Sequence, residues 1–185
     1  MKTALALVVC FLSVASGLMI PDSLEHQVVL DTSHRTSVCP DAPASKLYRL
    51  FHPDKESYLY TTSLGTSDSD IPSGFEYEIV AAHVYKHPQP STVPFYHLLN
   101  TRTANSFYTR DPRERDAVLA KDADYTSHGV CAHVFPRRLC GSKPFFRLHN
   151  PDTGNYFYTT DQKEVDRMVL DEGYADPVIA GFVML

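Results

Sequence analysis

Apolar and polar side chains alternate over three short stretches of the chain, and each stretch continues through turn-forming residues into a second aromatic run. The clearest stretch is 145–161, FFRLHNPDTGNYFYTTD, in which Phe146 and Leu148 share one face of a half-buried strand and Arg147 lies on the other. The link Asn-Pro-Asp-Thr-Gly supplies turn chemistry, because proline presets φ and glycine permits positive φ. The stretch therefore predicts a β-hairpin.

The same pattern is written three times, over 47–63, 95–111 and 145–161, with offsets of 48 and 50 residues. A second matched block, rich in small and β-branched residues, follows each copy from Gly74, Asp124 and Gly173 and predicts a further strand. Periods of this length are typical of propellers, solenoids and other repeat arrays.

Helices are predicted between the hairpin and the last strand in the second and third copies, over 112–121 and 162–171. Each begins with a capping-box pattern, an aspartate N-cap and a glutamate three residues later: Asp111 with Glu114, and Asp161 with Glu164. An apolar edge of Val165, Met168 and Val169 should pack the second helix onto its sheet.

The first copy departs from this pattern. Its segment 64–73 has no apolar face and contains Pro72, so the helix there is expected to be missing or reduced to a turn.

Each unit of about 48 residues reads β-β-α-β and cannot bury its apolar sheet face alone. We therefore predict a β-dominated α+β fold, in which three β-β-α-β repeats close around a pseudo-threefold axis like a very small propeller. The domain should span 46–185, with repeats at about 46–93, 94–143 and 144–185. The uncharged run 178–185 should be buried as part of the closure.

The first 17 residues, MKTALALVVCFLSVASG, combine one lysine, a short apolar run and an A-x-G cleavage pattern, which predicts a secretory signal peptide. Residues 18–45 read as an N-terminal arm. We expect a secreted, extracellular protein without membrane insertion, because no later stretch has the roughly 20 apolar residues that a membrane helix needs.

Charge argues against a nucleic-acid partner. Without Lys2 the chain carries 16 basic and 22 acidic side chains, a net charge of −6, and no basic stripe that could hold a phosphate backbone. The 11 Tyr and 10 Phe indicate an aromatic-rich globular domain.

Three cysteines follow the predicted signal peptide, so one disulfide and one free thiol are expected in an oxidising compartment. Cys39 and Cys140 both precede a repeat, whereas Cys131 aligns with alanines in the other copies. We predict a Cys39–Cys140 bridge with Cys131 buried. A Cys131–Cys140 bridge across a stapled hairpin is the alternative.

The unit Y-R-L … N-P-D-T-G-N-Y-F-Y-T-T-D … E-V-D-R … G-Y resembles an uncharacterised secreted repeat family of the form Y-R-L-Y-N … G-x-H-F-Y-T-T … G-W/Y. Such repeats recur in bacterial and fungal extracellular proteins, sometimes beside hydrolase domains. The resemblance covers about 46–185 and implies a surface or accessory binding module, with no catalytic residues to carry over. Ser106 stands where Tyr58 and Tyr156 stand, so ligand sites in the three units would be unequal.

No motif for catalysis or metal binding is present. The nine histidines are scattered, and no H-E-x-x-H, paired Cys/His, G-x-S-x-G or phosphate-loop pattern occurs. We predict no enzyme activity, no catalytic residues, no metal site and no cofactor.

Aromatic residues flanked by hydrogen-bonding side chains give the candidate ligand site, because sugars present C–H faces and hydroxyls. Tyr60, Tyr108 and Tyr158 should lie opposite Arg49, His97 and Arg147 in the hairpins. The alternative is that these tyrosines pack between the units. The predicted function is accordingly a non-catalytic, lectin-like glycan-binding module, or alternatively an extracellular-matrix or secreted protein-interaction component without a small ligand.

Overall fold

The computed structural model describes residues 38–64 and 71–185, which all belong to the compact unit Thr36–Leu185. The predicted signal peptide, most of the predicted N-terminal arm and the part of the first copy where a helix was expected to be missing (65–70) lie outside the described residues.

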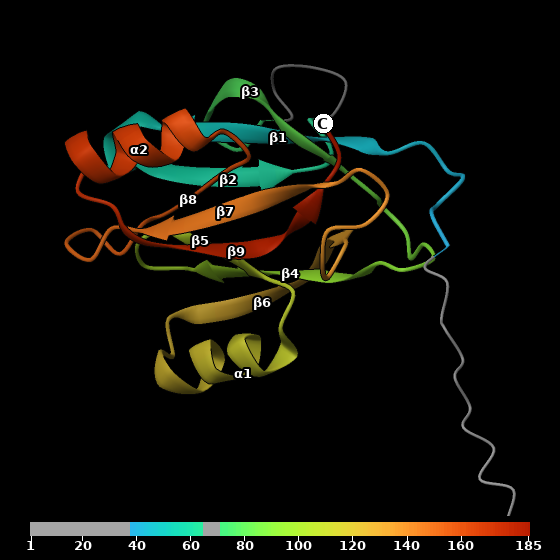
Figure 1. Ribbon diagram of the computed structural model, residues 1–185. Helices are drawn as coiled ribbons and strands as arrows, with labels where there is room; N and C mark the ends of the chain where they lie inside the picture. Colours follow the sequence, from blue (N-terminus) through green and yellow to red (C-terminus); the bar gives the residue numbers. More distant parts are fainter. Residues whose placement is uncertain (1–37, 65–70) are drawn as a thin grey trace, which may run out of the picture. The chain divides into compact units, whose positions relative to one another are not determined.

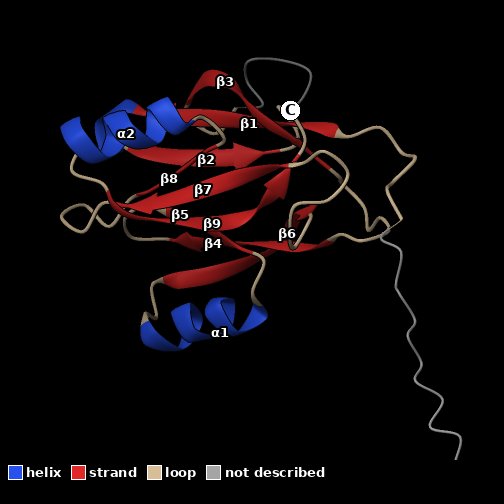
Figure 2. Cartoon of the chain, in the orientation of Figure 1, coloured by secondary structure: helices blue, strands red, loops and turns tan. Residues whose placement is uncertain are grey.

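The described chain is mostly β, with three separate three-stranded antiparallel sheets and two α-helices (Figures 1 and 2). The first sheet contains β1 (Ser45–His52), β2 (Ser57–Thr61) and β3 (Glu76–Val84), with a 3-10 turn, Pro53–Lys55, between β1 and β2. The second contains β4 (Val93–Asn100), β5 (Ser106–Thr109) and β6 (Tyr125–Val134). The third contains β7 (Lys143–His149), β8 (Tyr156–Thr159) and β9 (Ala175–Val183).

Each sheet has the same strand order, with the first strand of the predicted copy in the middle: β2-β1-β3, β5-β4-β6 and β8-β7-β9. The register is also repeated, because Arg49 pairs with Tyr60, His97 with Tyr108 and Arg147 with Tyr158. The three predicted hairpins are therefore confirmed.

The hairpins turn through a left-handed residue at one equivalent position. Glu56, Ala104 and Gly154 have φ of 50°, 63° and 73°. Only the third copy uses glycine there, so the first two turns hold an L-residue in a conformation that side chains disfavour.

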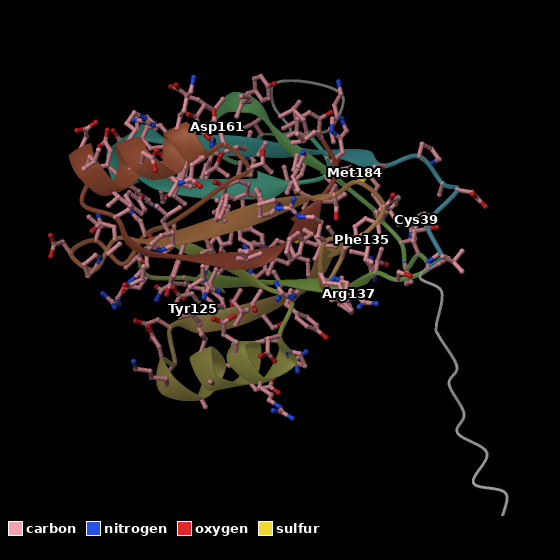
Figure 3. All side chains as sticks on the ribbon, in the orientation of Figure 1. Cys39, Tyr125, Phe135, Arg137, Asp161 and Met184 are labelled. Carbon is pink, nitrogen blue, oxygen red and sulfur yellow. A yellow bond between two sulfur atoms is a disulfide. The ribbon has the colours of Figure 1, made fainter. Side chains whose placement is uncertain are left out.

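Both predicted helices are confirmed, as α1 (Pro112–Lys121) and α2 (Gln162–Asp171). Asp111 caps α1, and Asp161, labelled in Figure 3, caps α2; each carboxylate accepts a hydrogen bond from the backbone N–H two residues later. The predicted capping boxes are wrong in their second half, because Glu114 and Glu164 bind arginine side chains instead.

The hairpin of the third sheet, β7 and β8, has buried residues on both faces, which corrects the prediction of a half-buried strand there. Phe145 and Tyr158 belong to a core cluster shared by all three sheets, while Leu148 and Phe157 belong to a second cluster that includes Met168 of α2. The helix covers the second face and keeps it from water. Val169, predicted to be part of the packed edge of α2, is 40 % exposed.

Short bridges join every pair of sheets near the ends of β3, β6 and β9. His83 pairs with Met184, Tyr85 with His133, and Phe135 with Phe182. The C-terminal run is thus paired at its end, but Val178 and Ile179 are 42 % and 43 % exposed, so its predicted burial is wrong over that part.

Cys39 and Cys140 form a disulfide with a Cα–Cα distance of 5.6 Å, which confirms the predicted pairing and excludes the Cys131–Cys140 alternative. Cys131 is a free thiol that donates to the Phe95 carbonyl at 3.3 Å. In the described part of the chain, no helix is long and apolar enough to cross a membrane.

Candidate functional site

Three buried tyrosines, Tyr60, Tyr108 and Tyr158, form a closed set of hydrogen bonds that we call the tyrosine cycle. Each hydroxyl accepts from the backbone N–H and donates to the carbonyl of the next tyrosine, at 2.7–2.9 Å: Tyr60 to Tyr158, Tyr158 to Tyr108, and Tyr108 to Tyr60. The ring centroids lie 5.3–5.6 Å apart in edge-to-face contacts.

The tyrosine cycle caps sheet edges. β2, β5 and β8 are edge strands. Without the tyrosine hydroxyls, the backbone N–H and C=O groups that bond to them would be unpaired in the core. At most 2 % of each tyrosine is exposed, and burial raises the pKa of each hydroxyl. This burial is at odds with the predicted ligand-binding role and matches the packing alternative.

Arg49 is also inaccessible, with 3 % of its side chain exposed. Its guanidinium forms ion pairs with Glu78 at 2.8 Å and with Glu164 of α2 at 2.7 Å. The two carboxylates take four of its five N–H donors and cover it, which is at odds with the predicted ligand contact at Arg49.

His97 stacks flat on the Tyr108 ring, with centroids 4.4 Å apart and planes 6° apart, and its Nε2 contacts the Ser106 hydroxyl. Burial, together with the nearby His128, lowers the pKa of His97 to about 3. His97 is therefore a neutral ring packed beside the tyrosine cycle, and its burial too is at odds with a ligand contact.

Arg147 differs from the other predicted residues because it lines a groove. It binds Glu114 of α1 through two hydrogen bonds, at 2.6 and 3.0 Å, and 14 % of its side chain is exposed. The groove, which we call the arginine groove, has a volume of about 490 Å³ and lies where the start of α1 meets β7 and β9.

A larger groove of about 650 Å³ lies between the hairpin turns of the second and third sheets, and we call it the hairpin groove. It is lined by the second turn, the end of α1 and the third turn: Asn100, Arg102, Thr103, Asn105, Val118, Lys121, Asp122, Tyr125, His149, Asp152, Thr153, Gly154 and Tyr156. The Asn105 amide donates to the Thr153 carbonyl at 3.3 Å and so fixes the two turns together.

Aromatic rings form part of this groove. Tyr156 stacks on His149 with centroids 4.7 Å apart, and Tyr125, labelled in Figure 3, begins β6 directly after α1. Neither tyrosine hydroxyl has a hydrogen-bond partner among the described residues, in contrast to the tyrosine cycle. Burial and the positive charge of Arg147 lower the pKa of His149, so it is neutral at pH 7.

Polar groups surround these rings. The carboxylate of Asp152 and the ammonium group of Lys121 have no hydrogen-bond partner in the described chain, whereas Arg102 is held by Asp124 at 2.5 Å. Asn100 is committed to its own turn, because its Oδ1 accepts from the N–H groups of Arg102 and Thr103. The open groups therefore include two phenols, one carboxylate and one ammonium.

The corresponding place between the third and first sheets is a smaller groove of about 170 Å³. Phe51, Glu56 and Tyr58 stand there in the positions of His149, Gly154 and Tyr156. Glu56 adds a side chain where the hairpin groove has only glycine, so the two grooves differ in size and in lining.

Sequence reasoning missed Tyr125, His149 and Tyr156 as a set. The substitution of serine for Tyr156 in the second copy was visible, but nothing in the pattern places Tyr125 of one copy beside Tyr156 of the next. Among the described residues, no cluster of three or more histidine, cysteine or acidic side chains could hold a metal ion.

A family model described as "Domain of unknown function (DUF5648)" matches residues 44–184. The chain therefore belongs to this family, which is uncharacterised, as the sequence resemblance implied. No curated protein and no solved structure matches the chain.

Proposed function

We propose that this protein is a secreted, non-catalytic module that binds saccharides at the hairpin groove. The observation that carries the proposal is the pair Tyr125 and Tyr156, whose rings line an open groove while their hydroxyls remain unpaired in the described chain. An aromatic face accepts the C–H face of a sugar, and phenols, carboxylates and amines bond its hydroxyls.

The chemistry of the groove favours an uncharged sugar there. Lys121 and Arg102 face Asp122, Asp124 and Asp152, so cations do not exceed carboxylates and the lining has no excess positive charge to hold an anion. The disulfide is compatible with secretion and with the predicted signal peptide over 1–17.

The same proposal includes the arrangement of the domain. Three repeats, at about 46–93, 94–143 and 144–185, are related by an approximate threefold axis, and they are the secreted repeats of bacterial and fungal proteins that the sequence resembles. Two cyclic sets of contacts support this arrangement: the tyrosine cycle, and the three bridges at the ends of β3, β6 and β9.

A glycan array on the full mature protein, followed by titration calorimetry on the best neutral glycan, tests the proposal. Tyr125→Ala should weaken binding about tenfold, because a lost aromatic stack costs roughly 1.4 kcal/mol. Tyr77→Ala is the matched control, since Tyr77 is 49 % exposed on β3 and does not line the groove. Absence of binding to any glycan, or equal affinity of Tyr125→Ala and wild type, would contradict the proposal.

A second candidate, protein interaction, is favoured by exposed apolar side chains on edge strands. Tyr77 and Ile79 of β3 and Val178 and Ile179 of β9 are between 42 % and 49 % exposed. Edge strands with exposed apolar residues are surfaces on which a further chain can pair. Light scattering of the mature protein would detect self-association. The Ile79→Lys variant, measured in the same way, should lose it if the contact is made through β3.

A further inference from the structure

Arg49 and Arg147 occupy equivalent places in the first and third sheets, each paired with a tyrosine of the tyrosine cycle. Each guanidinium carbon lies near two aromatic rings, at nearly the same distances. In Arg49 it lies 4.7 Å from the Phe157 ring centroid and 6.0 Å from that of Tyr58. In Arg147 it lies 4.7 Å from the Phe107 ring centroid and 5.9 Å from that of Tyr156. The two guanidinium groups are thus held in the same way.

Each arginine also binds a glutamate from the first turn of a helix. Arg49 donates to Glu164 at 2.7 and 3.0 Å, and Arg147 donates to Glu114 at 2.6 and 3.0 Å. In their two ring contacts and in their helix glutamate, the two arginine sites are chemically identical.

They differ in one carboxylate. Nε of Arg49 donates to Glu78 at 2.8 Å, and its second terminal nitrogen donates to the other Glu78 oxygen at 3.3 Å. These are the two donors of one edge of the guanidinium, which matches a carboxylate bidentately.

The third sheet lacks this carboxylate. Ile79 pairs with Arg49 and Val178 pairs with Arg147, so the residue that corresponds to Glu78 is Pro177. Nε of Arg147 has no hydrogen-bond partner in the described part of the chain. Its free edge belongs to a guanidinium that lines the arginine groove.

The local charge follows the same comparison. Arg49 is held by two carboxylates, Glu78 and Glu164, whereas Arg147 is held by one, Glu114. Arg147 is also more exposed than Arg49, 14 % against 3 %.

We propose that the arginine groove binds the carboxylate of a ligand on the free edge of Arg147, in the place that Glu78 occupies on Arg49. This site is separate from the hairpin groove and does not depend on saccharide binding there. Its volume of about 490 Å³ is within the range of small-molecule sites.

The ligand that fits is a saccharide with a uronic acid. A peptide could reach the groove by pairing with the β9 edge, but Pro177 has no N–H and the Ile179 carbonyl already accepts from Arg110 at 2.9 Å. Those two backbone groups are therefore unable to pair with a peptide strand. Val93, Pro136 and Val178 supply apolar lining for a sugar ring.

Titration calorimetry on the full mature protein tests this site with a glucuronate-terminated disaccharide. We expect one equivalent to bind, and the same disaccharide ending in glucose to bind at least about tenfold more weakly, because it lacks the charge-assisted hydrogen bonds. Pro177→Glu should abolish binding, because the new carboxylate takes the edge of Arg147 as Glu78 takes that of Arg49. Pro177 is exposed, so this variant should fold as the wild type does.

The complementary variant should gain a site. Glu78→Ala uncovers Arg49 and should raise the stoichiometry to two, whereas Glu76→Ala, an exposed carboxylate on the same strand, should leave it at one. Tyr125→Ala should not change uronate binding, which separates this site from the hairpin groove.

Equal binding of the acidic and neutral disaccharides, or uronate binding that survives Pro177→Glu, would overturn the proposal. Acetate that binds as tightly as the disaccharide, or a peptide C-terminus that binds more tightly, would overturn the assignment to a saccharide.

Discussion

Replacing Tyr158 with phenylalanine removes one oxygen atom from the tyrosine cycle and leaves the ring in place. The Tyr158 hydroxyl accepts from the Tyr108 N–H at 2.7 Å and donates to the Tyr108 carbonyl at 2.9 Å. Tyr158 and Tyr108 are both completely buried, so water cannot take over either bond without opening the core. The variant Tyr158→Phe therefore strands two backbone groups on an edge strand.

The cost follows from those two groups. A buried donor or acceptor without a partner costs about 1–3 kcal/mol, so the free energy of unfolding should fall by about 2–5 kcal/mol. For a domain of this size the melting temperature should fall by roughly 4–20 °C, since each kcal/mol shifts it by about 2–4 °C. The change is large for the loss of one oxygen atom because both bonds join different sheets.

Urea unfolding followed by far-ultraviolet circular dichroism, with the disulfide intact, measures this change. Tyr77→Phe is the control, because Tyr77 is 49 % exposed and its hydroxyl loss should change the unfolding free energy by less than about 0.5 kcal/mol. If Tyr158→Phe costs no more than this control, the tyrosine cycle does not hold the sheets together and the packing argument is wrong.

Further predictions concern the disulfide, pH and the free thiol. Reduction of the Cys39–Cys140 disulfide, or replacement of both cysteines by serine, should lower the unfolding free energy by about 2–5 kcal/mol. Thermal melting with and without reductant measures this, and an unchanged melting temperature would show that the disulfide does not constrain the unfolded chain. Stability should decline as pH falls below about 6.5, because the unfolded chain protonates His97 while burial keeps the folded imidazole neutral until about pH 3, and a flat profile in urea titrations from pH 7 to 4 would contradict this. Below about pH 4.3 the decline should steepen, because the hydrogen bonds of Glu114 with Arg147 and of Glu164 with Arg49 outweigh burial and lower both glutamate pKa values; Glu114→Gln should reduce that slope. Burial raises the pKa of the partly buried Cys131 thiol to about 12, so a thiol reagent at pH 8 should label it far more slowly before unfolding than after, and rapid native labelling would contradict the raised pKa.

Apolar and polar alternation predicted the hairpins, the aspartate N-caps predicted both helices, and the repeat period predicted the separation into three sheets. These are local properties: the turn sequence fixes the hairpin register, and an aspartate N-cap starts a helix whatever lies across from it. The Cys39–Cys140 bridge was also predictable, because the repeat register placed Cys131 in a slot that alanine fills in the other copies.

The role of the tyrosines depended on contacts between copies. The sequence placed Tyr60, Tyr108 and Tyr158 opposite Arg49, His97 and Arg147, and the structure has that register. Whether those rings face solvent or a neighbouring sheet edge is decided by packing across about 50 or 100 residues of chain, which no local pattern encodes.

The grooves, too, required the tertiary structure. Tyr125 and Tyr156 come from different copies, and the open edge of Arg147 exists because a proline stands where Glu78 stands in the first sheet. Sequence periodicity determined which residues repeat. The physical difference between equivalent positions, a satisfied arginine in one sheet and an open one in another, is a long-range electrostatic property that only the assembled sheets decide.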